Sequence, residues 1–144
     1  MTTKTRDWMT VRQLKQLSKR SLSLHRALSA MAETTNEAAP RQRLLAAARA
    51  TGTASAELQA ELSPVQVGAA PRPRGVLAGL TRWAARLSPR SAWALLRWAL
   101  DYQMHRLREA GKQVDGRAHK LLRERTVPLH DQAWSLLSDD RRTD

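Results

Sequence analysis

The feature that most constrains the fold is the spacing of apolar residues between about Thr10 and Glu33. These residues recur at heptad-like intervals on one face of a helix: Leu14, Leu17, Leu24, Leu28 and Met31. Ser21 is the one weak position in this seam, and the basic residues fall largely on other faces. The segment therefore predicts a long amphipathic helix, with Thr10 as its N-cap.

The composition extends this prediction to the whole chain. There is no Phe and a single Tyr, so the bulk of a core must come from Leu, Ala and five Trp. Leu and Ala are strong helix formers, whereas the β-branched and aromatic residues that favour strands are scarce. A chain of 144 residues is the usual size of one domain. We expect a single all-α domain.

Three further helical segments follow the first. Pro40 suits the first turn of a second helix, whose apolar seam is Leu44, Leu45, Ala47, Ala48, Ala54, Leu58 and Leu62. Gly52 in the middle of that helix marks either a weak point or close packing. The stretch "SPVQVGAAPRPRG" is rich in Pro and Gly, so it reads as a long connector that crosses the end or side of a bundle.

The third segment starts near Gly75 with a seam of Val76, Leu80, Trp83 and Leu87. "SPR" at 88–90 interrupts it, and a second seam follows with Trp93, Leu96, Leu100 and Leu107. The fourth segment begins near Gln113, and Pro128 should kink or restart it.

These segments predict a four-helix bundle with a long Pro/Gly connector between the second and third helices. The expected boundaries are an N-terminal arm at 1–9, one bundle domain at 10–137 and a frayed tail at 138–144. No internal repeat or low-complexity tract is evident.

The net charge of +12 and the isoelectric point of about 11.5 favour polyanionic partners. The stretch from Pro71 to Trp98 concentrates this charge, since it holds three Trp and six Arg without an acid. Three interpretations are open. The arginines form a solvated outer face, they contact nucleic acid phosphates without sequence preference, or they join Trp in contacting a membrane surface. The arginines concerned are Arg72, Arg74, Arg82, Arg86, Arg90 and Arg97.

Motifs of catalysis are missing from the sequence. Without cysteine there is no disulfide, thiol nucleophile or zinc–thiolate site. There is also no nucleophile elbow, Walker loop or dinucleotide fingerprint. The N-terminus lacks the apolar core of a secretory signal, and no run is long enough to span a bilayer. We expect a cytoplasmic protein without enzymatic activity or a cofactor.

A metal site is the one chemical alternative. Bundle enzymes of the di-iron type use inward Glu residues from two helices and Glu-x-x-His from the other two. No Glu-x-x-His occurs here, but acidic and His residues do share faces of the second and third helices. The candidate ligands for iron or manganese are Glu57, Glu61, Asp101, His105 and Glu109.

The order of features resembles a bacterial family of ferritin-like four-helix domains of unknown function. The second helix ends in "AELQAEL", and the third segment opens with "RGVLAGLTRWAARL". The matching residues are Glu57, Leu58, Glu61, Leu62, Gly75, Gly79, Arg82 and Trp83, and the closing helix carries "LHDQAWSLLSD". The family usually has several Glu residues where this chain reads "LLRWALDYQMH", with Asp101 as its only acid. The resemblance therefore implies a degenerate member that keeps the bundle as a scaffold.

Together these observations predict a non-catalytic interaction or scaffold protein with a strongly basic surface. We expect it to self-associate through apolar seams or to bind an acidic protein. The alternatives are nucleic-acid binding through the Arg-rich face and a degenerate carboxylate/His metal site.

Overall fold

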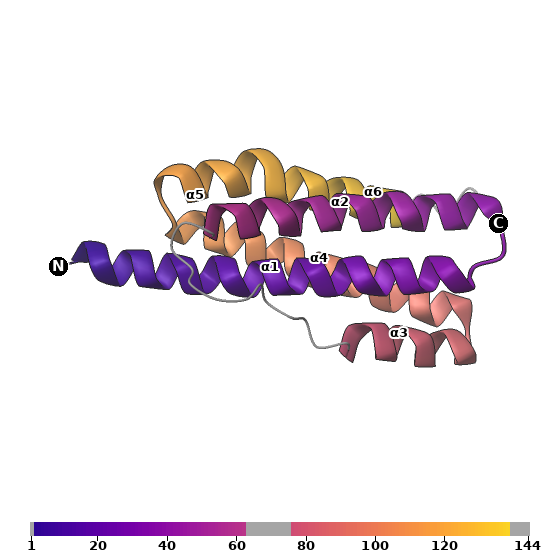
Figure 1. Cartoon of the computed structure of the whole chain (residues 1–144). Helices are drawn as coiled ribbons and strands as arrows, with labels where there is room; N and C mark the ends of the chain where they lie inside the picture. The colour runs from indigo at the N-terminus through magenta and orange to yellow at the C-terminus, as the bar shows by residue number, and fades with distance from the viewer. Residues whose placement is uncertain (1, 63–75, 139–144) are drawn as a thin grey trace.

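The computed structural model describes residues 2–62 and 76–138, and this part of the chain is helical with no strand (Figure 1). The all-α prediction is confirmed. The elements are α1 (Thr2–Thr34), α2 (Ala38–Leu62), α3 (Val76–Leu87), α4 (Pro89–Gln113), α5 (Gly116–Leu121), a π-helix η1 (Leu122–Thr126) and α6 (Val127–Ser138).

Long helices pack side by side to form the body of the molecule. α1 contacts α2 and α4, and α6 contacts the same two helices, so these four elements close a ring. α5, η1 and α6 follow one another as one continuous rod. The short helix α3 packs against α1 and α4 and lies on the opposite side of the molecule from α5 and α6 (Figure 1).

The first helix is longer than its apolar seam indicated. α1 begins at Thr2, so the start predicted at Thr10 is wrong, and residues 2–9 are helical instead of an arm. The sequence before Pro40 contains neither Gly nor Pro, so no residue of that kind interrupts a helix at residues 2–9. At its other end, the hydroxyls of Thr34 and Thr35 donate to the carbonyl of Met31 at 3.0 and 2.7 Å. The predicted connector and residues 139–144 of the predicted tail lie outside the described residues.

Prolines mark helix boundaries as expected. Pro40 lies in the first turn of α2, and Pro89 opens α4 directly after Ser88, so the third segment is two helices. Pro128 does not end its helix, but the π turn η1 lies just before it. A regular α-helix would press the Pro128 ring against the carbonyl of Glu124 and leave that carbonyl without its donor. A local π turn is one way to relieve such a conflict.

The core consists of two apolar clusters. The first joins the C-terminal half of α1 to α2, α4 and α6, with the fully buried leucines Leu24, Leu28, Leu44, Leu96, Leu100 and Leu137. The second surrounds the N-terminal half of α1 with Leu14, Leu17, Leu58, Leu62, Leu107 and Leu122. All the seam residues predicted for α1 are buried, which confirms the orientation of that helix.

A layer of buried polar side chains separates the two clusters along the helices. Its members are Ser18, Ser21, Thr51, Ser55, Gln103, Thr126 and His130. Ser18 and Ser55 bind reciprocally, since each hydroxyl donates to the other residue's carbonyl at 3.3 and 3.1 Å. Buried polar groups are tolerated when they are hydrogen-bonded to one another in this way.

The orientation of α3 differs from the prediction. This helix turns Leu77, Thr81 and Ala85 toward the core, whereas Leu80 and Trp83 of the predicted seam remain 47% and 61% exposed. The side chains of the other two predicted seam residues, Val76 and Leu87, are not among those described. α3 has two apolar stripes, and the smaller residues face the groove between α1 and α4. Small residues allow helices to approach closely.

Candidate interaction surface

The arginines of α3 line a groove against the C-terminal end of α1. Arg82 and Arg86 are both exposed, and the groove between α3 and α1 encloses about 310 Å³. Its other walls are Ala30, Met31, Thr34, Thr81 and Ala85. Because the other described residues that line the groove carry no ionisable group, the two guanidinium groups supply the charge of its described lining.

A second groove of about 420 Å³ adjoins the first and shares Met31, Thr34 and Ala85 with it. Arg90, in the first turn of α4, lines this groove, and so does Glu37 from the turn between α1 and α2. Arg82, Arg86 and Arg90 therefore surround one end of α1. We call this set the basic surface.

The other predicted arginines are placed differently. Arg97 lies two turns beyond Arg90 on α4, is half-buried and lines neither groove. Arg97 therefore lies apart from Arg82, Arg86 and Arg90, although it follows Arg90 on the same helix. Arg72 and Arg74 lie outside the described residues.

Exposed aromatic and large aliphatic side chains gather on the same hairpin of helices. Among the described side chains, the exposed large hydrophobic residues are Leu80, Trp83, Trp98, Tyr102 and Trp134. All but Trp134 belong to α3 or α4. Scattered exposed hydrophobic residues are normal, but four of these five lie on two consecutive helices, which also carry the basic surface.

Two of these residues form a stacked pair on α4. The ring centroids of Trp98 and Tyr102 are 6.0 Å apart, with an interplanar angle of 22°. The guanidinium carbon of Arg20, on α1, lies 5.7 Å from the Tyr102 centroid, within the range of a cation–π contact. Trp98 is 64% exposed, so its outer face is open to a ligand.

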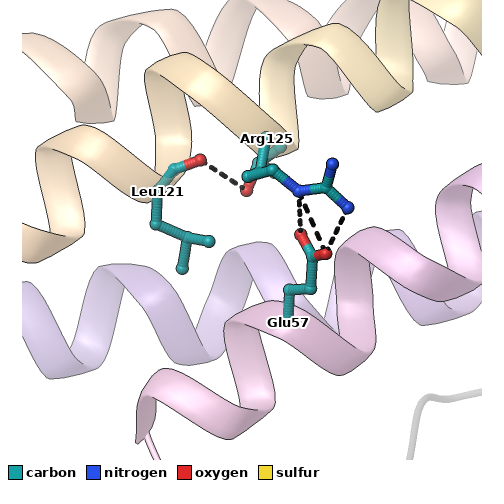
Figure 2. A network of polar contacts seen from close by, with 4 residues as sticks. Glu57, Leu121 and Arg125 are labelled. Carbon is teal, nitrogen blue, oxygen red and sulfur yellow. Dashed lines mark hydrogen bonds and ion pairs between the residues drawn. The ribbon is translucent and has the colours of Figure 1, made fainter.

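The carboxylates of α2 are used in ion pairs with the last part of the chain. Arg125 Nη2 donates to Glu57 Oε1 at 2.6 Å, and its Nε donates to the same carboxylate at 3.1 Å (Figure 2). The hydrogen bond and the negative charge of Glu57 both raise the pKa of Arg125. Glu61 lies 3.8 Å from Arg117. These pairs fasten α2 to α5 and η1.

The three candidate ligands on α4 do not meet the two on α2. Asp101 and His105 are exposed, and Glu109 pairs with Lys112 at 3.5 Å. Within residues 2–62 and 76–138, no group of three or more His, Asp or Glu side chains is arranged to hold a metal ion. The prediction that an iron or manganese site assembles from Glu57, Glu61, Asp101, His105 and Glu109 is therefore wrong. The two residues on α2 pair with arginines of α5 and η1, whereas the three on α4 are exposed to solvent or paired with Lys112.

The buried polar layer contains the residue that sequence reasoning missed, His130. Its side chain is fully buried, with Nδ1 2.8 Å from the Thr126 carbonyl and Nε2 3.0 Å from Ser21 Oγ. A carbonyl only accepts, so Nδ1 donates and Nε2 accepts from Ser21. Gln103 Nε2 donates in turn to Ser21 Oγ and to the Leu17 carbonyl. Burial lowers the pKa of His130, which favours the neutral ring.

Comparison with known proteins gives no match to this chain, whether among family models, curated proteins or solved structures. In the described residues, no helix combines the length and apolar character needed to cross a membrane.

Proposed function

We propose that this chain is a non-catalytic interaction protein that binds an acidic partner through the basic surface. The observation that carries the proposal is the convergence of Arg82, Arg86 and Arg90 on two adjoining grooves. Among the described residues that line them, Glu37 is the only acid. A concave site with charge of one sign raises the local concentration of an oppositely charged partner.

The scaffold in this proposal is a ferritin-like four-helix bundle of a degenerate type, acting in the cytoplasm. Support comes from the ring of contacts among α1, α2, α6 and α4. The pairing of Glu57 and Glu61 with arginines supports a structural role for positions that a metal-binding relative would use as ligands. The bundle would then serve to present α3 and the start of α4.

Fluorescence anisotropy tests this proposal with two labelled probes, a polyglutamate peptide and a random DNA duplex. The variant R82E/R86E/R90E should bind the peptide at least about tenfold more weakly, because three favourable charges become repulsive. The matched control is K15E/K19E/K120E, which changes the net charge equally at exposed positions on α1 and α5. An equal loss in both variants would mean that diffuse net charge, and not the basic surface, binds the probe.

A second candidate function is binding of single-stranded nucleic acid, favoured by the stacked pair of Trp98 and Tyr102 beside Arg20. Exposed aromatic rings next to arginines provide stacking platforms for bases, worth about 1–3 kcal/mol per base. The variant W98A/Y102A should therefore weaken binding of a labelled oligothymidylate and leave polyglutamate binding unchanged. Equal oligothymidylate affinity in the wild type and W98A/Y102A would rule this function out.

A further inference from the structure

Helix α3 presents three different faces. Leu77, Thr81 and Ala85 pack inward, and Arg82 and Arg86 line the groove beside α1. The remaining face holds Leu80 and Trp83, which follow each other at the i, i+3 spacing that places side chains together on a helix. We infer that this third face docks on an anionic lipid surface. The inference rests on the proposed function, since it names the acidic partner of the basic surface.

The apolar face of α3 is unusual because a large apolar area remains in water. Trp83 is 61% exposed and Leu80 is 47% exposed, although Leu77 on the same helix is packed against the core. Transfer of such side chains from water into an apolar phase is favourable in proportion to the area removed. A partner that covers this face therefore gains hydrophobic free energy in addition to any charge interaction.

The charge around α3 selects an anionic occupant. No acid occurs between Glu61 and Asp101 in the sequence, so α3 and the first turns of α4 carry only positive charge. Each basic residue held near an anionic bilayer contributes about 1 kcal/mol. The same charge opposes a second copy of this chain, because Arg82 and Arg86 give both copies the same positive charge beside the docking face.

The shape and residue types favour a bilayer over an acidic protein. α3 lies on the outside of the molecule with α1 and α4 behind it, so its free face protrudes (Figure 1). A protruding helix with Trp and Leu on one face and Arg on another matches helices that lie in the headgroup region. Trp83 also supplies the amphipathic ring that is enriched in the headgroup region.

Sedimentation of the full chain with vesicles tests the inference. One set of vesicles is phosphatidylcholine alone, and the other contains equal amounts of phosphatidylcholine and phosphatidylglycerol. We expect partition only into the second set. W83S should lower the partition coefficient about tenfold, because it removes the inserted indole. The double variant R82E/R86E should lower it by at least about tenfold, because two attractive charges become repulsive.

The matched control is W134S, which removes a 39% exposed indole from α6 on the opposite side of the molecule. Equal losses for W83S and W134S would overturn the inference, because they would show that α3 is not the docking helix. Sedimentation equilibrium of the wild type and of W83S tests for a second copy as the occupant. If W83S weakens self-association but leaves vesicle binding unchanged, a second copy covers this face and the inference is overturned.

The failure of this inference is distinguishable from the failure of the proposed function. If the chain binds neither set of vesicles but binds polyglutamate through Arg82, Arg86 and Arg90, then the lipid inference is refuted and an acidic protein remains as the partner. A chain that binds neither vesicles, polyglutamate nor duplex DNA would refute both.

Discussion

Ser21 on α1 and His130 on α6 are joined by a buried hydrogen bond of 3.0 Å that crosses the centre of the molecule. The bond has a defined direction, since His130 Nδ1 is committed to the Thr126 carbonyl and Nε2 must accept from the Ser21 hydroxyl. Protonation of Nε2 would place two donors opposite each other. The hydroxyl would have to turn, while Gln103 Nε2 already donates to the same oxygen.

Stability should therefore fall with acidification in a way that depends on His130. Burial lowers the pKa of His130 below its ordinary value of 6.5, against weaker opposing effects of the Thr126 carbonyl and Asp131. Below about pH 6.5 the unfolded chain binds a proton at this site and the folded chain does not. The free energy of unfolding should drop by up to about 1.4 kcal/mol per pH unit until the folded-state pKa is reached, and this contribution should vanish above pH 6.5.

Urea unfolding between pH 5 and pH 8 measures this effect. The variant H130Q should be less stable at pH 7.5 but should have a shallower pH dependence than the wild type. The control is H105Q, because His105 is exposed on α4 and should leave the slope unchanged. A wild-type slope retained in H130Q would assign the pH dependence to other groups.

Gly52 should resist substitution by alanine. A Cβ at this position would lie 2.9 Å from His25 Nδ1, the atom that bonds the Ala48 carbonyl at 2.7 Å. The ring is held by that bond, so G52A should overpack the contact between α1 and α2. We expect a loss of about 1–3 kcal/mol, measured as a lower urea midpoint.

The contrast with Gly79 makes this prediction specific. A Cβ at Gly79, in the middle of α3, would meet no described atom within 4 Å apart from its chain neighbours and the backbone of its own helix. The variant G79A should gain about 0.5–1 kcal/mol, because alanine loses less conformational freedom on forming a helix. Stabilisation by G52A of similar size would mean that the His25 ring moves aside without cost.

The helical content and the buried faces of the long helices were predictable, because the helical spacing of the apolar residues indicates both. The apolar residues predicted for the seam of α1 lie on one face of the helix, and all of them are buried. Ser21, the weak position of that seam, pairs with His130, which lies on the buried face of α6 with Ala133 and Leu137. A search for polar residues at seam positions of two helices would have found this pair.

The orientation of α3 was not predictable from its own sequence. Periodicity identifies the larger apolar stripe but not which stripe fits the available space, and the groove between α1 and α4 takes Leu77 and Ala85. The prediction of a metal site was wrong for a related reason. Spacing places residues on one face of a helix but does not determine which residues of other helices that face contacts. Glu57 forms its ion pair with Arg125, which lies 68 residues further along the chain.

The ion pair of Glu57 and Arg125 should contribute a small, salt-sensitive amount to stability. Arg125 is exposed while the Glu57 carboxylate is partly covered, so solvent screens much of the attraction. E57Q should lower the thermal midpoint slightly at low ionic strength and have less effect in molar salt. The control D101N removes an exposed carboxylate from α4 and should show no such difference. A loss in E57Q that does not depend on salt would indicate a packing effect.

Trp93 and Trp83 should respond to different extents to the same substitution. Trp93 is buried, and its Nε1 donates to the Leu137 carbonyl at 2.7 Å, which ties the start of α4 to the end of α6. W93F deletes this donor and leaves a buried carbonyl unsatisfied, so we expect a loss of about 1–3 kcal/mol in the free energy of unfolding. Trp83 is exposed on α3, and W83F should stay within about 0.5 kcal/mol of the wild type. Urea denaturation of the two variants measures both values, and a loss for W83F as large as that for W93F would mean that the predicted seam of α3 is buried after all.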